Sequence, residues 1–418
     1  MRVLGLPFGI EDMTERKTYY FDNNATTRVA PEVVDAMLPF LRDFWGNPSS
    51  AYGFGSQVAK SIEQAREKIA ILIGADPKEI VFTGCATESN NAALQSALAT
   101  QPGKRHVITT AVEHSAIIKH AELLQKQGCD VTFLPVDADG ALDLHLLDQS
   151  IRPDTAIVSV MWANNETGVV FPIEEVAAIC RSRNVLFHTD ATQAPGKLAI
   201  NMHEIGADFL SLSAHKLHAP KGVGLLYVKR RTKFQPYLIG GHQERGKRGG
   251  TENVAGIIGF GCAAELALER FSDENSRVRS LRDRLEEKIL RTVPNSQRNG
   301  AKEPRLPNTS NIAFDFVEAE GILIELDKLG ICVSSGSACT TGSLNPSHVL
   351  TAMGIKPARA RGCVRFSLGY DNTAEEVDYL LTHIPPVIAR LREASAEKSP
   401  KPRTSRHTHG AVAESLAK

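Results

Sequence analysis

The chain has 418 residues, of which 48 are lysine or arginine and 48 are aspartate or glutamate, so its formal net charge is zero. This composition is typical of a globular protein of about two domains, and it offers no overall positive field for nucleic acid. No apolar run reaches the ~20 residues that a membrane-spanning helix needs. We therefore expect a cytoplasmic protein that binds neither nucleic acid nor a membrane. The seven cysteines are an odd number without metal-ligand spacing, which argues against a disulfide framework or a structural metal site.

The first part of the chain is predicted to be helical after a loose start. Residues 1–18 show no clear periodicity and are expected to form an extension. Helices are predicted over residues 31–40, where Pro31 suits a helix start, and over residues 56–73, where apolar side chains recur at helical spacing. The turn between them contains Asn47, which could also face a pocket.

Strands and helices alternate from residue 80 onward. Seven apolar runs are strand candidates, at residues 80–83, 106–110, 131–136, 156–162, 185–188, 209–212 and 223–228. Most of these runs are too apolar for a half-exposed sheet, and most are separated by enough chain for a helix. The pattern predicts a large α/β domain over residues 19–274, with a seven-stranded, mainly parallel sheet covered on both faces. Ligands of such domains bind outside the carboxyl ends of the strands.

The residues after the first two strands suit a phosphate group and a catalytic imidazole. The small and polar residues 84–91 lead into a helix expected over residues 92–98, and such a turn presents free N–H groups and the positive end of the helix dipole to an anion. As a lone motif this is weak evidence, because strand–turn–helix junctions are common caps. His114 follows the second strand, where a structural role and an active-site role are about equally expected.

Lys216 is the residue around which a cofactor site can be built. It lies between the last two predicted strands, although a lysine in such a position is usually a solvated loop residue. Asp190 and Gln193 follow the preceding strand. A phosphate cradle, an imidazole, a carboxylate and a lysine at one edge of a sheet are the groups that hold pyridoxal phosphate. The lysine forms an imine with this cofactor, and the carboxylate keeps the ring nitrogen protonated.

The rest of the chain is less regular. Residues 240–251 are glycine-rich and basic, which fits a phosphate-binding loop and a solvated loop equally well. From about residue 275 to 395, helices and strands in mixed order predict a smaller α+β domain. Residues 396–418 lack apolar content and are predicted to be disordered.

Cys339 is the cysteine whose surroundings indicate a reactive thiol. It belongs to the loop at residues 332–345, in which every residue between Ser334 and Ser343 is small or hydroxylated. Such a loop buries little surface, so we expect it to move and its thiol to be exposed. A nucleophilic cysteine beside a pyridoxal phosphate site narrows the chemistry considerably.

These residues resemble the pyridoxal-phosphate-dependent cysteine desulfurases of the aminotransferase class-V group. The resemblance covers about residues 19–393. It rests on seven motifs in order: Asp22-Asn-Asn-Ala-Thr-Thr27, Ala86-Thr87-Glu88, Glu113-His114, Asn164-Asn165-Glu166, Asp190-Ala-Thr-Gln193, Ser213-Ala-His215-Lys216 and Ser334-Ser-Gly-Ser-Ala-Cys339-Thr. Residues 161–168, 215–222 and 241–246 are most similar to the nitrogen-fixation, or NifS-type, branch. The resemblance implies an aminotransferase-like large domain of PLP fold type I, a smaller α+β domain and a homodimer.

The resemblance also implies a role for each candidate residue. Lys216 would hold the cofactor as its Schiff-base lysine and then act as the base at the substrate Cα, and His114 would stack on the ring and move protons. Asp190 would pair with the ring nitrogen, and Gln193 with the phenolic oxygen. Further cofactor contacts would be Ala86, Thr87, Asn165, Ser213 and His215, with Thr251 donated across the dimer interface. The substrate carboxylate would be bound by Arg365, helped by Asn165 and Asn47.

The implied reaction removes sulfur from L-cysteine, giving L-alanine and a persulfide on Cys339. The sulfur would pass to an iron–sulfur scaffold protein, and Cys339 would contact the growing cluster transiently. The NifS-type motifs imply a role in nitrogenase maturation. Three alternatives remain at this stage. A selenocysteine lyase tolerates loss of the cysteine, a class-V aminotransferase needs no cysteine loop, and a non-enzymatic sulfur carrier would leave Lys216 unexplained.

Overall fold

The computed structural model describes residues 17–335 and 346–398. Three predicted features therefore lie outside the described residues, wholly or in large part. They are the N-terminal extension up to residue 16, the segment at residues 336–345 that contains Cys339, and the tail from residue 399. Among the described helices, none is long and apolar enough to cross a membrane.

A seven-stranded sheet forms the centre of the larger unit, as predicted. Its strands are β2 (Ile80–Thr83), β3 (His106–Thr110), β4 (Asp130–Leu134), β5 (Thr155–Ser159), β6 (Leu186–Asp190), β7 (Phe209–Ser213) and β8 (Gly224–Val228). They lie in the order β2-β8-β7-β6-β5-β3-β4. β8 runs antiparallel to both of its neighbours, and the other pairs are parallel. Because this sheet is covered on both faces, five of its strands are buried along their whole length.

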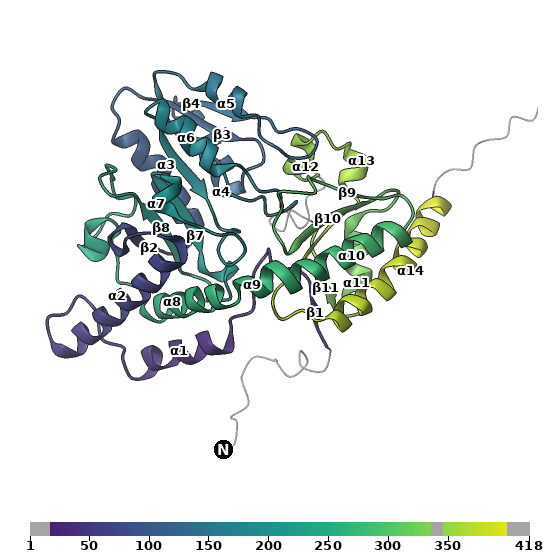
Figure 1. Ribbon diagram of the computed structural model, residues 1–418, viewed down its shortest axis with the longest axis horizontal. Coiled ribbons are helices and arrows are strands. Elements are labelled where there is room, and N and C mark those ends of the chain that lie inside the picture. Colours follow the sequence, from purple (N-terminus) through teal and green to yellow (C-terminus); the bar gives the residue numbers. More distant parts are fainter. Residues whose placement is uncertain (1–16, 336–345, 399–418) are drawn as a thin grey trace, which may run out of the picture.

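Helices cover both faces of the large sheet (Figure 1). They are α1 (Pro31–Arg42), α2 (Gly53–Ile73), α3 (Ala86–Ala99), α4 (Ser115–Lys126), α5 (Leu144–Ser150), α6 (Ile173–Ser182), α7 (Met202–Ile205) and α8 (Val254–Glu269). The predicted helix at residues 56–73 is confirmed, and it ends at Gly74 in the left-handed region, with a φ of 59°. α2 packs closely on α8, because a Cβ at Gly261 would lie 2.7 Å from the Cβ of Ala65.

The smaller unit is built on an antiparallel sheet of three strands, β9 (Ser296–Arg298), β10 (Thr309–Phe314) and β12 (Cys363–Ser367). α10 (Arg279–Thr292), α11 (Ala319–Asp327) and α14 (Ala374–Lys398) pack around it and enclose a second hydrophobic core (Figure 1). The short helices α12 (His348–Ala352) and α13 (Pro357–Ala360) precede β12. α8 leads into this unit through α9 (Phe271–Asp273) and a π-helical turn (Glu274–Val278). We propose that the domain boundary falls at this turn, near residue 275.

The first described residues join the smaller unit rather than the larger one. β1 (Tyr19–Tyr20) pairs in parallel with β11 (Ile331–Cys332), and Phe21 is fully buried in the second core. The chain then crosses to the large sheet, where Thr27 N donates to His215 O at 3.0 Å. Residues 22–27 therefore lie between the two units.

Two predicted boundaries are wrong. The helix expected over residues 92–98 begins six residues earlier, at Ala86, because Ala86 to Asn91 form the first turns of α3 instead of a loop. The tail expected to be disordered from residue 396 is helical through Lys398, where α14 ends. Alanine, glutamate and lysine favour helix formation, so these residues continue α14 past Ile388, its last buried apolar residue in the described chain.

Candidate active site

One cavity of about 590 Å³ lies at the carboxyl ends of the parallel strands, between the two units. It is large enough for a cofactor with a small substrate. Residues from many separate segments line it, including Asn24, Ala86, Thr87, Asn90, His114, Asn165, Asp190, Gln193, Ser213, His215, Lys216 and Arg365. The structure thus brings together almost all of the candidates derived from the sequence.

Lys216 ends a single 3₁₀ turn, Ala214–Lys216, that follows directly from β7. Its Nζ donates to the backbone oxygens of Asn24 and Ala25, both at 2.6 Å. These two carbonyls come from the segment that crosses between the units. They hold the amine at the edge of the cavity, so that its position depends on the docking of the N-terminal segment.

The N-terminus of α3 lies at the edge of the cavity where an anion site was predicted. Cys85 is the N-cap residue and makes no side-chain cap, so the first N–H groups of the helix are not used by that side chain. Ala86 and Thr87 lie in the first turn and line the cavity. The nearby carboxylate of Glu88 is neutralised by Arg248, with 2.9 Å between Oε1 and Nε. A phosphate group suits this position, because free N–H groups and the helix dipole both favour an anion.

Asp190 is the last residue of β6, and it is 5% exposed. Its Oδ1 accepts a hydrogen bond from Thr192 N at 3.0 Å, and its Oδ2 accepts one from Asn90 Nδ2 at 2.7 Å. Each carboxylate oxygen therefore has one neutral donor. Because both carboxylate oxygens are held by a hydrogen bond, the lone pairs that remain on them point in fixed directions.

His114 caps α4, and its Nδ1 accepts from Ala116 N at 3.2 Å. Burial lowers the pKa of His114, and the nearby Lys216 lowers it further, against the opposing effect of Asp190. The ring is therefore neutral at neutral pH, and because Nδ1 is an acceptor, its proton is on Nε2. His215 is similar, since burial and Lys216 lower its pKa to about 4.

Orphaned polar atoms in the cavity wall support a bound polar group. Asn90 Oδ1, Thr192 Oγ1 and Gln193 Oε1 are buried and have no hydrogen-bond partner among the described residues. All three residues line the cavity. Buried polar atoms are nearly always satisfied, so three unpartnered atoms in residues that line one cavity fit a ligand with several polar substituents, such as pyridoxal phosphate.

Arg365 reaches the cavity from β12 of the smaller unit and is only 1% exposed. Its Nη2 lies 2.7 Å from Asp22 Oδ1, and its Nη1 donates to Asn165 O at 2.9 Å. The segment at 22–27 and the loop after β5 therefore fix the guanidinium group in place. A cation held in this way can recognise a carboxylate.

Glu166 and Glu113 are two buried acids beside the cavity to which sequence reasoning gave no role. Glu166 Oε2 accepts from Ser347 Oγ at 2.6 Å, and burial raises the pKa of Glu166. Glu113 O accepts from His348 Nε2 at 2.8 Å. The helix α12, which Ser347 caps, is thereby anchored to the loops after β3 and β5.

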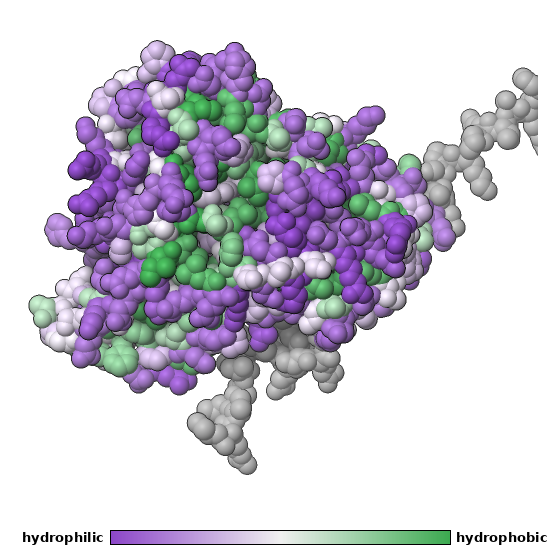
Figure 2. Space-filling model, in the orientation of Figure 1, coloured by the Kyte–Doolittle hydropathy of each residue, from purple (hydrophilic) through white to green (hydrophobic). Residues whose placement is uncertain are grey.

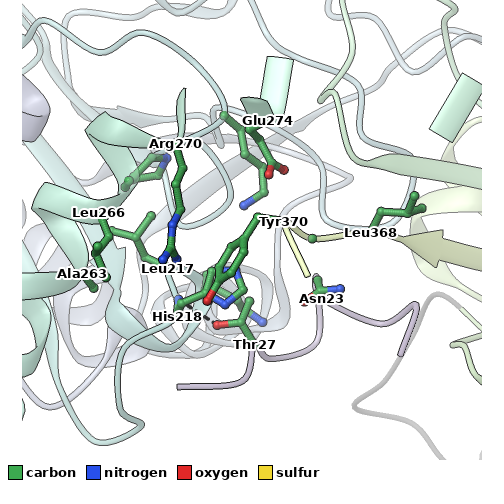
Figure 3. A pocket seen from close by; sticks show the side chains of 16 residues that line it. Asn23, Thr27, Leu217, His218, Ala263, Leu266, Arg270, Glu274, Leu368 and Tyr370 are labelled. Carbon is green, nitrogen blue, oxygen red and sulfur yellow. Dashed lines mark hydrogen bonds between the residues drawn. The ribbon is translucent and has the colours of Figure 1, made fainter. Parts of the chain in front are cut away.

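A second, much smaller cavity of about 40 Å³ lies on another side of Lys216, at the junction of the two units (Figure 3). The guanidinium carbon of Arg270 lies 4.0 Å from the ring centroid of Tyr370, and the His218 ring centroid lies 4.3 Å from the same ring. Glu274 also lines it, and burial raises the pKa of that carboxyl to about 7. The volume suits a few waters but no amino acid, so the larger cavity is the candidate active site.

Three predicted residues are not brought to the cavity. Asn47 is exposed in a turn, where its Oδ1 accepts from Ser49 N at 2.9 Å, and its role in binding substrate stays a prediction. Thr251 is exposed on the surface, and its contribution to a second subunit also stays a prediction. Cys339 lies outside the described residues. The basic loop before Thr251 docks on the large unit, where Arg66 and Glu244 form a buried ion pair at 2.7 Å.

Asn90 and Ser347 are functional candidates that the sequence prediction missed. Asn90 was assigned to a turn, but it lies on α3 three residues after Thr87, and residues at this spacing share a helix face. Starting the helix at Ala86 would have placed Asn90 toward the phosphate site. Ser347 showed a clear local signal as a helix N-cap, but no local pattern identified its partner Glu166.

The fold and this site define a PLP-dependent enzyme of the aminotransferase type. Residues 19–380 match the model of the family "Aminotransferase class-V", and the chain belongs to this family, whose cofactor is pyridoxal 5′-phosphate. It is 54% identical to "Cysteine desulfurase 2" of Trichormus variabilis over 376 residues, which cover 90% of this chain and 94% of that protein. It is 52% identical to "Cysteine desulfurase NifS" of Azotobacter vinelandii over 377 residues, with coverages of 90% and 94%.

A solved structure described as a NifS-like protein is also similar. Its TM-score is 0.85 at 39% sequence identity, and the match covers 90% of this chain and 100% of that one. These comparisons confirm the resemblance to NifS-type cysteine desulfurases that the motifs indicated. They also confirm the prediction of PLP fold type I.

Proposed function

We propose that this enzyme is a cysteine desulfurase, which removes the sulfur of L-cysteine and leaves L-alanine. The observation that carries the proposal is the single cavity in which Lys216, His114 and Asp190 of the large unit face Arg365 of the smaller one. The names of its relatives support the same reaction.

The cavity wall offers one group for each part of the cofactor. The first turn of α3 with Thr87, together with Ser213 and His215, would hold the phosphate. Asp190 would take the ring nitrogen, and the amide of Gln193 would take the phenolic oxygen. When bound, pyridoxal phosphate withdraws electrons from the carbon atoms of the attached amino acid.

The side chains of the cavity provide the acid–base chemistry. Lys216 would anchor the cofactor covalently, and its amine, once free, would serve as a base for the Cα proton of the substrate. His114 is neutral because burial lowers its pKa. It would accept the proton of the substrate thiol on Nδ1, which requires this atom to release its hydrogen bond from Ala116 N. Arg365 would bind the substrate carboxylate and fix the orientation of the amino acid.

Cys339 would be the sulfur acceptor. Its thiolate attacks the substrate sulfur, the S–S bond forms as the C–S bond breaks, and the electron pair of the C–S bond stays on carbon, which takes up a proton. Alanine and a persulfide result without any further oxidant. The chain on each side of residues 336–345 is tied to the cavity. Arg365 N donates to Ser334 O at 2.7 Å, and Ser347 is bound to Glu166.

The persulfide sulfur would pass to an iron–sulfur scaffold protein, with Cys339 in transient contact with the cluster under assembly. Identity of 52% to a relative named NifS supports a role in nitrogenase maturation. We also propose a cytoplasmic location. The six described cysteines are all free thiols, as expected in a reducing compartment.

We propose that the enzyme is a homodimer. Large apolar side chains are exposed on and around α1 and α2 and on the segment after β8, including Leu41 (62%), Trp45 (73%), Tyr52 (58%) and Ile239 (86%). Pale and green residues are visible over the α1–α2 end of the molecule in Figure 2. Exposed apolar groups of this size are typical of interfaces. Thr251 is also exposed and follows Ile239 by twelve residues in the chain.

Mass spectrometry after incubation with L-cysteine alone tests the reaction. We expect one additional sulfur on Cys339 and none on Cys332, which serves as the matched cysteine in the same region of the chain. Cys339→Ala should keep the visible absorbance of the cofactor and release no sulfide, whereas Lys216→Ala should lose that absorbance. Undiminished sulfide release by Cys339→Ala would exclude the persulfide mechanism.

A further inference from the structure

Asn90 is a fully buried amide inside the active-site cavity. It lies in α3, three residues after Thr87, and its side chain has two different environments. Nδ2 donates to Asp190 Oδ2 at 2.7 Å, whereas Oδ1 has no partner among the described residues. Asn90 and Asp190 are 100 residues apart in sequence, so only the packing of α3 on the sheet brings them together.

The contact fixes the orientation of the Asp190 carboxylate. Thr192 N holds Oδ1 from the backbone of the same loop, and without Asn90 the other oxygen would have no donor among the described contacts. Two donors on two oxygens restrict rotation of the carboxylate plane. A neutral N–H donated to a carboxylate also stabilises its charged form in a buried place.

A neighbouring buried acid, Glu113, has a different arrangement of donors. Glu113 is also buried and also accepts two hydrogen bonds, from Thr110 Oγ1 and Met161 N, but both reach the same oxygen. Its Oε2 has no partner among the described residues, and burial raises the pKa of Glu113 to about 8. Asp190 differs from Glu113 in geometry, because each of its carboxylate oxygens has its own donor and the one on Oδ2 comes from Asn90.

We propose that Asn90 is a positioning residue for the cofactor ring. Its amide holds the Asp190 carboxylate in the orientation that receives the protonated ring nitrogen, and so acts on the cofactor through Asp190. The proposal rests on the function proposed above, in which Asp190 pairs with that nitrogen. A purely structural Asn90 would instead stabilise α3 and influence every ligand of the cavity equally.

Two ligands separate these possibilities. Pyridoxamine 5′-phosphate and its 1-deaza analogue, in which a C–H group replaces the ring nitrogen, have the same phosphate and nearly the same shape. Neither has an aldehyde, so neither can be captured covalently by Lys216. Their affinities for the full-length apoprotein, measured by calorimetry, report the non-covalent contacts without any turnover.

Asn90→Ala should lower the affinity for pyridoxamine 5′-phosphate by roughly 10- to 100-fold, which is the usual effect of losing a hydrogen bond to a charged group. It should leave the affinity for the 1-deaza analogue unchanged. Asn90→Leu, which keeps the branching at Cγ and the number of heavy atoms but has no donor, should show the same selectivity and covers the case in which the alanine variant does not fold. Asn91→Ala is the matched control, because Asn91 is the next residue of the same helix and does not line the cavity.

The proposal is overturned if the Asn90 variants lose affinity for both ligands equally, or if they lose affinity for neither. Asp190→Asn separates this failure from failure of the underlying function. If Asp190→Asn does not distinguish the two ligands, the pairing of Asp190 with the ring nitrogen is wrong. If Asp190→Asn distinguishes them and the Asn90 variants do not, only the role of Asn90 is wrong.

Discussion

Replacing Glu113 by glutamine is expected to make the protein increasingly more stable than the wild type as the pH rises from about 5 towards 8. The Glu113 side chain is fully buried, its Oε1 accepts from Thr110 Oγ1 at 2.8 Å and from Met161 N at 2.9 Å, and burial raises its pKa from 4.5 to about 8. The carboxyl is therefore protonated at neutral pH. Glutamine has the same shape, keeps the acceptor oxygen and has no proton to lose.

The magnitude follows from the difference in bound protons. Between pH 4.5 and about 8, the folded state retains a proton on Glu113 that the unfolded state has released. Because the folded pKa is raised, this stabilising contribution is complete below pH 4.5 and is lost as the pH rises, by about 1.4 kcal/mol per pH unit. Between pH 5.5 and 7.5 the wild type should lose roughly 2.7 kcal/mol from this group, and the glutamine variant should not.

Urea unfolding at pH 5.5, 6.5 and 7.5 measures this difference, with both proteins at one concentration because a dimer is proposed. Other titrating groups, such as Glu274 with its pKa of about 7, are common to both proteins and cancel in the comparison. The stability advantage of Glu113→Gln should grow with pH. If the two stability curves are parallel over this range, Glu113 is not a protonated acid in the folded state and the reasoning is wrong.

Three other substitutions test the packing around the site. Glu244→Gln should cost about 3–5 kcal/mol of unfolding free energy, because it leaves the buried guanidinium of Arg66 with only the exposed Glu63 as a carboxylate partner; urea unfolding measures it. Ser347→Ala should cost roughly 1–2 kcal/mol through loss of a helix cap that also binds Glu166, and an unchanged midpoint of unfolding would contradict that role. Gly224→Ala should prevent cofactor capture, seen as lost visible absorbance, because its Cβ would lie 2.6 Å from the carbonyl carbon of Cys85.

The sequence was sufficient for the large sheet because most of its strands are apolar runs that are bounded by turn residues. A buried parallel strand leaves this local signature, and the polar residues that follow it mark the edge where ligands bind. His114, Asp190 and Lys216 were therefore placed correctly at neighbouring strand ends and line one cavity. The mixed order of helices and strands after about residue 275 also predicted the α+β character of the smaller unit.

What the sequence could not provide were partners from distant segments and one helix start. Residues 86–91 are small and polar, which suggested a turn, but the first turn of a helix tolerates such residues and the packing of α3 on the sheet compensates for them. The hydrogen bond of Ser347 to Glu166 joins residues 181 positions apart. No periodicity or spacing encodes a contact of this range, because it depends on how the two units dock.

The crossing segment at residues 22–27 has a consequence for how the enzyme matures on the ribosome. The carbonyls that hold Lys216 belong to Asn24 and Ala25, which are made near the start of synthesis. Yet this segment docks on Ser367, through Asn23 N donating to Ser367 O at 3.0 Å, and that residue emerges near the end. A nascent chain that has completed the whole seven-stranded sheet therefore still lacks a finished lysine environment. We therefore expect the cofactor site to be completed only after β12 has been synthesised.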